Sequence, residues 1–161
     1  MRRRLLLGAA VLLSGCGFTL KRAPELSFKT IQLAGFPPRS ALAAELRSQL
    51  DASPTTRVVE SASEAQVILQ VLSEARERIV VAQTSASQIR EFELRLRLRF
   101  RVRSAAGRDL IGESEIVQSR SMTYTETIAL AKEQEEATLY RSMQTDIVAQ
   151  VLRRLASVRL V

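Results

Sequence analysis

Five arginines alternate with apolar residues near the middle of the chain, in the run LRLRLRFRVR. They are Arg95, Arg97, Arg99, Arg101 and Arg103. Successive side chains of a β-strand point to opposite faces, so all five guanidinium groups are expected on one face of a sheet. A guanidinium group is permanently charged and binds phosphate or carboxylate through a planar pair of N–H donors. The row therefore indicates either an anionic ligand or a solvated face whose charge discourages aggregation.

Cys16, the only cysteine, is placed where its thiol could be modified during export. A basic start (residues 2–4) precedes an apolar run (residues 5–13) and then the sequence LSGC. That order is typical of a signal peptide, and the apolar run is too short to span a bilayer. The stretch resembles a bacterial lipobox, which implies lipid transfer to the Cys16 thiol, cleavage before it and durable anchoring by several acyl chains. The alternative is an ordinary signal peptide followed by an incidental thiol.

The composition excludes several kinds of catalytic site. The 161 residues include no histidine and one cysteine, so neither a Ser-His nor a Cys-His pair can be built. A zinc site with the usual nitrogen and sulfur ligands is excluded for the same reason. We therefore expect a protein that is not an enzyme and that needs no metal or cofactor. Lys and Arg exceed Asp and Glu by 24 − 17 = 7, which favours an anionic partner.

Nucleic acid is one anionic partner that the alternation disfavours. Proteins that bind single strands stack bases on aromatic side chains within a basic surface. Phe92 and Phe100 alternate to the face opposite the arginines, and an export signal removes the chain from cytoplasmic nucleic acid. We expect no nucleic-acid partner.

The flanking sequence predicts the elements that position the arginine row. A first helix should follow Ser40 as its N-cap, and a last helix of about thirty residues should begin at Thr125 or Thr127. A polar loop at residues 83–88 and a hairpin turn around Gly107 separate the predicted strands. Those strands are residues 30–34, 65–73 with an extension through 79–82, 92–103 and 109–124.

This order of elements predicts an α+β fold, a two-layer α/β sandwich with the order β-α-β-β-β-α. Two helices would cover one face of a mixed four-stranded sheet and leave the other face, with the arginine row, open. We expect a signal peptide at residues 1–15, a lipidated tether at 16–27 and a single domain at 28–161.

Several short motifs in this order resemble the LPS-assembly lipoprotein family LptE. They are CGFTL at 16–20, EFEL at 91–94, ALAKE at 129–133 followed by Glu135 and Glu136, and RRL at 153–155. The resemblance implies an outer-membrane lipoprotein that plugs and supports the LptD β-barrel in a one-to-one complex. It also implies binding of lipopolysaccharide during its transport and insertion into the outer leaflet. Glycine rather than aspartate at position 17 favours the outer membrane for lipoproteins of this type.

The resemblance also implies site residues. Cys16 matches the lipidated cysteine, and Lys132 matches the lysine of the LAK segment that contacts lipopolysaccharide. The loop at residues 83–88, where family members can carry a second basic residue, is uncharged here. We expect Arg90, or Arg95, Arg97 and Arg99 together, to take its place, with Lys132 near one edge of the arginine face. The rival interpretation is a structural adaptor lipoprotein of another envelope complex, which co-purification would distinguish.

Overall fold

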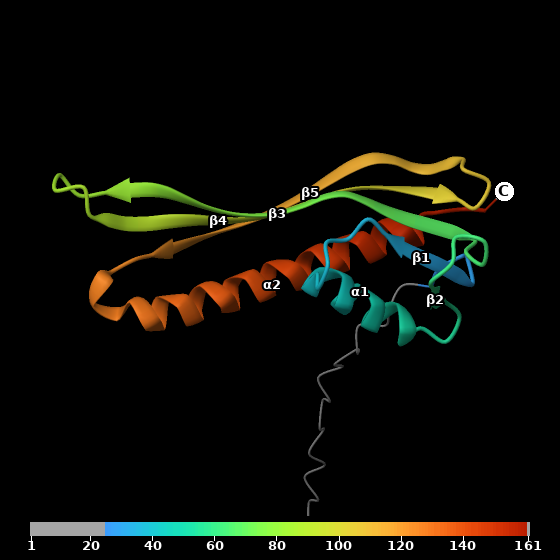
Figure 1. Cartoon of the computed structure of the whole chain (residues 1–161), viewed down its shortest axis with the longest axis horizontal. Coiled ribbons are helices and arrows are strands. Elements are labelled where there is room, and N and C mark those ends of the chain that lie inside the picture. The colour runs from blue at the N-terminus through green and yellow to red at the C-terminus, as the bar shows by residue number, and fades with distance from the viewer. Residues whose placement is uncertain (1–24, 161) are drawn as a thin grey trace, which may run out of the picture.

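A computed structural model describes residues 25–160, in which two α-helices lie against one face of a mixed sheet (Figure 1). The expected signal peptide, Cys16 and most of the expected tether lie outside the described residues. The strands are β1 (Thr30–Ala34), β2 (Arg57–Val59), β3 (Val67–Gln83), β4 (Ile89–Ser104) and β5 (Asp109–Thr123). The α-helices are α1 (Ala41–Asp51) and α2 (Ala129–Ala156). The α+β class and the helices on one face are confirmed.

The sheet has the order β2-β1-β3-β4-β5, so the predicted four strands become five. The first strand, β1, is parallel to both β2 and β3, whereas β3, β4 and β5 are antiparallel neighbours. The additional strand, β2, has three residues and, within residues 25–160, pairs only with β1. A strand this short is paired on one side only and has no room for a period-two pattern, so the sequence alone did not reveal it.

The two helices begin in different ways. The Ser40 side chain accepts a hydrogen bond from the Ala43 N–H at 3.0 Å, which confirms the predicted N-cap of α1. The predicted cap of the last helix at Thr125 or Thr127 is wrong. A 3₁₀ turn at Glu126–Ile128 leads into α2, and neither segment has a side-chain cap from its own N-cap residue, Thr125 or Ile128. The turn gives some of the first N–H groups of the helix backbone carbonyls as partners. Sequence propensity does not indicate such an arrangement.

The core lies between the helices and the sheet. Leu42, Leu46 and Leu50 of α1 are buried, as are Met143, Ile147, Val148, Val151 and Leu155 of α2. The even-numbered apolar residues of β4 pack against them, which is the face predicted from alternation. No helix among residues 25–160 is both long and apolar enough to cross a membrane.

Candidate functional site

The arginine row lies on the face of the sheet that the helices leave open. Phe92, Leu94, Leu96, Leu98, Phe100 and Val102, which alternate with the arginines, are buried under the sheet. The arginines are half-buried, apart from Arg99, which is exposed. The prediction from strand alternation is confirmed for the position of the row.

Carboxylates on β3, β4 and β5 pair with the first two arginines of the row. Glu77 of β3 lies between Arg95 and Arg97, with nitrogen–oxygen distances of 3.8 and 3.7 Å. Arg95 also contacts Glu93 at 3.2 Å, and Arg97 contacts Glu115 of β5 at 3.6 Å. Cross-strand pairs of opposite charge stabilise a sheet, so the repulsion of an isolated row is offset by acids on three strands.

The remaining three arginines of the row are also partnered. Arg99 donates to Glu113 of β5, and this hydrogen bond, together with the charge of the carboxylate, raises the pKa of the Arg99 guanidinium. At the C-terminal end of the row, Arg101 and Arg103 both donate to the side-chain oxygen of Gln70, at 3.0 and 2.9 Å. The open face therefore carries positive and negative groups side by side.

This face remains accessible to a ligand. The side chains of Arg95 and Arg97 are 30% and 34% exposed, and that of Glu77 is 37% exposed. Ion pairs this exposed contribute about 1 kcal/mol or less each. An anionic ligand could therefore replace the Glu77 carboxylate as the partner of either guanidinium group, at a small cost in free energy.

Lys132 sits in the first turn of α2, near the far end of the open face. Its Nζ atom lies 2.8 Å from Glu135 and 3.2 Å from the hydroxyl of Thr123, and its side chain is 12% exposed. Thr123 pairs with Glu91, and Arg95 lies four residues further along β4. At the rise of a strand, that offset is about 13 Å. Lys132 is thus at one edge of the arginine face, as expected, without contacting the row.

Arg90 lies on the other face of the sheet. It is two residues before Phe92 in β4 and therefore shares the helix-facing side. Its side chain is exposed and its carbonyl accepts a hydrogen bond from the Tyr124 N–H. The structure therefore brings Arg95, Arg97 and Arg99 together, places Lys132 at their edge, and puts Arg90 on the opposite face from the three arginines.

Comparison with known families assigns the chain to one of them. Residues 28–155 match the family described as LptE, Lipopolysaccharide-assembly. The chain belongs to the LptE family. The match extends from the segment before β1 almost to the end of α2, so the family assignment covers the whole two-layer fold. No match is found among curated proteins.

Solved structures of lipoproteins resemble this LptE family member. The solution structure of an uncharacterized lipoprotein B from Nitrosomonas europaea is 29% identical, with a TM-score of 0.74 over 88% of this chain and 91% of that chain. The rare lipoprotein B from Shewanella oneidensis is 20% identical, with a TM-score of 0.67 over 80% and 95%. A minor lipoprotein from Acinetobacter baumannii is 18% identical, with a TM-score of 0.65 over 83% and 94%. The last two show the fold alone.

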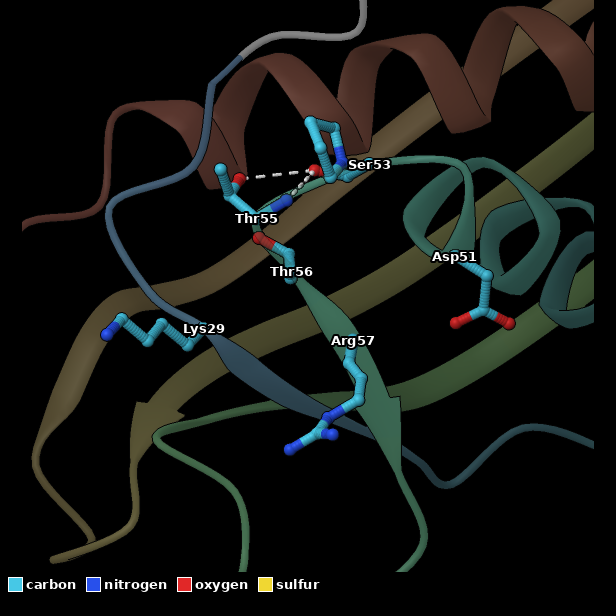
Figure 2. Close-up of a pocket in the computed structure, with 7 residues that line it drawn as sticks. Lys29, Asp51, Ser53, Thr55, Thr56 and Arg57 are labelled. Atoms are coloured by element: carbon cyan, nitrogen blue, oxygen red, sulfur yellow. Dashed lines mark hydrogen bonds between the residues drawn. The ribbon is translucent and has the colours of Figure 1, made fainter.

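A hollow that sequence analysis missed lies between β1, β2 and the end of α1 in this LptE family member. Its volume is about 400 Å³, and its lining includes Lys29, Asp51, Ser53, Thr55 and Arg57. Figure 2 shows the Lys29 and Arg57 side chains extending away from the Ser53 and Thr55 hydroxyls, which lie 3.3 Å apart. The cations therefore do not converge with the hydroxyls on one point. The described residues also contain no acidic or cysteine cluster arranged to hold a metal ion.

Proposed function

We propose that the chain is an outer-membrane lipoprotein that plugs and supports the LptD β-barrel and binds lipopolysaccharide during its insertion into the outer leaflet. Membership of the lipopolysaccharide-assembly family is the observation that carries this proposal. The open sheet face supports it, because alternating arginine and glutamate side chains suit the polar lumen of a barrel. The lipid on Cys16 would hold the chain at the membrane.

Co-purification tests the partner. The full chain, tagged at its C-terminus, is extracted from Gram-negative envelopes in mild detergent and analysed by size and by mass spectrometry. We expect a one-to-one complex with LptD that contains lipopolysaccharide. Recovery of the lipoprotein alone, or with a different envelope assembly, would reject the proposal in favour of an adaptor role.

Lipid attachment at Cys16 has a separate test. Mass spectrometry of the mature N-terminus from membranes should find acyl chains on residue 16. The Cys16→Ala variant should appear as a folded protein in the periplasm without membrane attachment. An unmodified thiol on membrane-derived wild-type protein would reject the anchor.

For lipopolysaccharide contact, we propose Lys132 with Arg95, Arg97 and Arg99, and Arg90 as a separate basic group. Phosphates of lipid A are anionic, and guanidinium groups match them bidentately. Arg95 and Arg97 share Glu77, so a phosphate that displaces this carboxylate would meet two guanidinium groups at once. Lys132 adds a charge at the edge of the same face.

A triple variant tests this assignment. Lys132→Gln, Arg95→Gln and Arg97→Gln together should weaken binding to purified lipopolysaccharide between about tenfold and about a hundredfold, since three contacts of about 1 kcal/mol or less each sum to at most about 3 kcal/mol. Binding should also become less dependent on salt. The matched control removes Lys29, Arg47 and Arg57, three cations near α1 and β2. Equal loss in both variants would indicate a net-charge effect and reject the site. The single variant Arg90→Gln tests that residue alone.

A further inference from the structure

One edge of β3 has no neighbouring strand over most of its length. β1 pairs with β3 only from Val67 to Gln70. Gly35 then lies against the Val71 carbonyl, because a Cβ on this glycine would come within 2.3 Å of the oxygen. Beyond that point no strand of residues 25–160 pairs with this edge, and Figure 1 shows the β3–β4 hairpin projecting past β1 and α1.

The backbone direction along β4 follows from two hydrogen bonds at its ends. The Ala105 N–H, just after β4, donates to the Gln66 carbonyl next to β3. The Tyr124 N–H donates to the Arg90 carbonyl from the β5 side. In an antiparallel strand the N–H and C=O of one residue point the same way, and successive residues alternate. Odd-numbered β4 residues therefore hydrogen-bond towards β3 and even-numbered ones towards β5.

The register then identifies the outward-facing groups of β3. Glu77 lies opposite Arg95, an odd-numbered residue of β4, so the backbone of Glu77 faces β4. Its neighbours Arg76 and Arg78 consequently direct their N–H and C=O groups away from the sheet. Their side chains point to the helix-facing side, since Arg76 lies 5.2 Å over the Tyr140 ring and Arg78 lies 4.8 Å over the ring of Phe92.

The other edge of the sheet differs, because side chains cap it. Glu115 and Ser119 of β5 lie opposite odd-numbered β4 residues, so their carbonyls also point outwards. Arg154 donates to the Glu115 carbonyl at 3.4 Å, and Arg120 donates to the Ser119 carbonyl at 2.8 Å. An unpaired edge is a template for another strand, and natural sheets usually blunt it. Among the described residues, β5 is blunted in this way, whereas no comparable bond covers Arg76 or Arg78.

A charged groove accompanies the free edge. Two adjoining hollows, of about 550 and about 490 Å³, lie between β3 and α2 and share Arg76, Ala137 and Tyr140. Arg78 pairs with Glu136 at 3.1 Å, and Arg141 donates to the Thr138 hydroxyl. Arg76 has no carboxylate partner among residues 25–160. Glu133 and Glu136 also line the groove, so the unneutralised guanidinium charge beside the unpaired backbone is that of Arg76.

We propose that an extended segment of a partner protein, with carboxylates at alternate positions, adds as a strand to β3 at Arg76 and Arg78. Strand addition uses backbone hydrogen bonds for affinity and alternate side chains for specificity. Carboxylates opposite the two arginines would point into the groove. The residue between them would lie beside Glu77 on the other face, with Ala75 and Ile79 on either side. A second copy of this chain does not fit, because antiparallel pairing of β3 with itself would place these arginines against each other.

Hydrogen–deuterium exchange on the full chain in mild detergent tests this inference with two synthetic probes. One is a blocked nine-residue peptide alternating valine and glutamate, and the other alternates valine and lysine. The outward amides of Arg76 and Arg78 should exchange rapidly in the free protein. We expect the glutamate peptide to slow their exchange at least tenfold and the lysine peptide to leave it unchanged. No protection by the glutamate peptide, or equal protection by both, would overturn the proposal.

A pair of variants separates strand addition from simple charge attraction. Arg76→Ala removes the guanidinium and keeps the N–H, whereas Arg76→Pro removes both, at an outward edge position where proline is tolerated. The alanine variant should bind the glutamate peptide several-fold more weakly, and the proline variant should lose binding. Equal affinities would indicate a charged surface only and overturn strand addition.

Two further experiments deal with a proline variant that does not fold and with pairing between two copies of the chain. If Arg76→Pro does not fold, the variant Arg76→Glu with Arg78→Glu should switch preference to the lysine peptide, and failure to switch would overturn the proposal. Concentration-dependent protection of this segment without peptide, accompanied by dimers in sedimentation, would identify a second copy as the occupant and also overturn it. All of these measurements are independent of LptD and lipopolysaccharide.

Discussion

At the scale of single residues, Tyr140 joins α2 to the middle of β3. Its hydroxyl donates to the Glu77 carbonyl at 2.8 Å, and its ring is buried under the Arg76 guanidinium. A carbonyl oxygen has two lone pairs, so Glu77 can accept this bond in addition to its bond within the sheet. This contact connects the long helix to the strand that pairs with the arginine row.

Removing the Tyr140 hydroxyl tests this link. Tyr140→Phe keeps the ring and leaves a partly buried carbonyl with one partner fewer, so unfolding by urea should require about 1 kcal/mol less free energy. Tyr124→Phe is the matched control, because its hydroxyl makes no described hydrogen bond, and its stability should stay within about 0.5 kcal/mol of wild type. Equal losses in the two variants would contradict a specific role for the bond.

The same phenol predicts a dependence on alkaline pH. Burial, and then the nearby charge of Glu136, raises the pKa of Tyr140 above its ordinary value. A raised folded pKa means that the neutral form is favoured by folding. Its contribution is full below the unfolded pKa of about 10 and is lost as pH rises through the folded pKa. The stability difference between wild type and Tyr140→Phe should be constant up to about pH 10 and shrink above it, as urea titrations can measure. A difference that grows above that pH would contradict the sign.

At the scale of elements, the loop from β1 to α1 depends on a glycine. Gly35 has a φ of 78°, and a side chain there would meet the Val71 carbonyl. This close approach allows the chain to turn from the sheet edge to Ser40, where α1 begins. This one loop therefore determines where β1 ends, where α1 begins and where the free edge of β3 starts.

Alanine substitutions at two glycines separate the cost of a positive φ from the cost of a close backbone contact. Gly107 in the β4–β5 turn also has a positive φ, 85°, but a Cβ there meets nothing within 4 Å. Gly107→Ala should cost about 1–2 kcal/mol from the backbone conformation alone. Gly35→Ala should cost clearly more, because the carbonyl of a central strand must move as well. Thermal unfolding of both variants measures this, and equal losses would show that the Val71 contact is not restrictive.

At the scale of the whole molecule, one apolar layer holds the sheet to both helices, while the charged face contributes little to stability. Leu98 is fully buried in β4, between the paired Arg97 and Arg99 of the opposite face. The exposed ion pairs above it each contribute about 1 kcal/mol or less. Folding is therefore driven from the helix side, and the open face is left free for contacts.

Two leucine truncations measure this asymmetry. Leu98→Ala should destabilise the protein by about 2–5 kcal/mol, because it removes buried methyl groups and leaves a cavity. Leu72→Ala, at a residue 39% exposed beside the bulge in β3, should cost about 1 kcal/mol or less. Denaturant unfolding distinguishes these losses, and comparable values would contradict a single dominant core.

Local sequence patterns by themselves determine most of the fold. Period-two alternation places the β4 arginines on one face, and a period near four places the Leu42 and Met143 stripes in the core. The Ser40 cap and the turn at Gly107 depend on a few adjacent residues, so they too are predictable. The motif residues that resemble LptE also come from sequence alone, and the family match confirms the resemblance.

Tertiary structure alone decided which groups meet across strands. The sequence could not show that Glu77 lies between Arg95 and Arg97, because strand register depends on packing and on bulges distant along the chain. It could not reveal the three-residue β2, which in the described part of the chain pairs with β1 alone. The free edge at Arg76 exists because β1 ends where the β1–α1 loop turns away, far along the chain from β3. Local propensity depends on neighbours in sequence, whereas charge balance and open edges depend on neighbours in space.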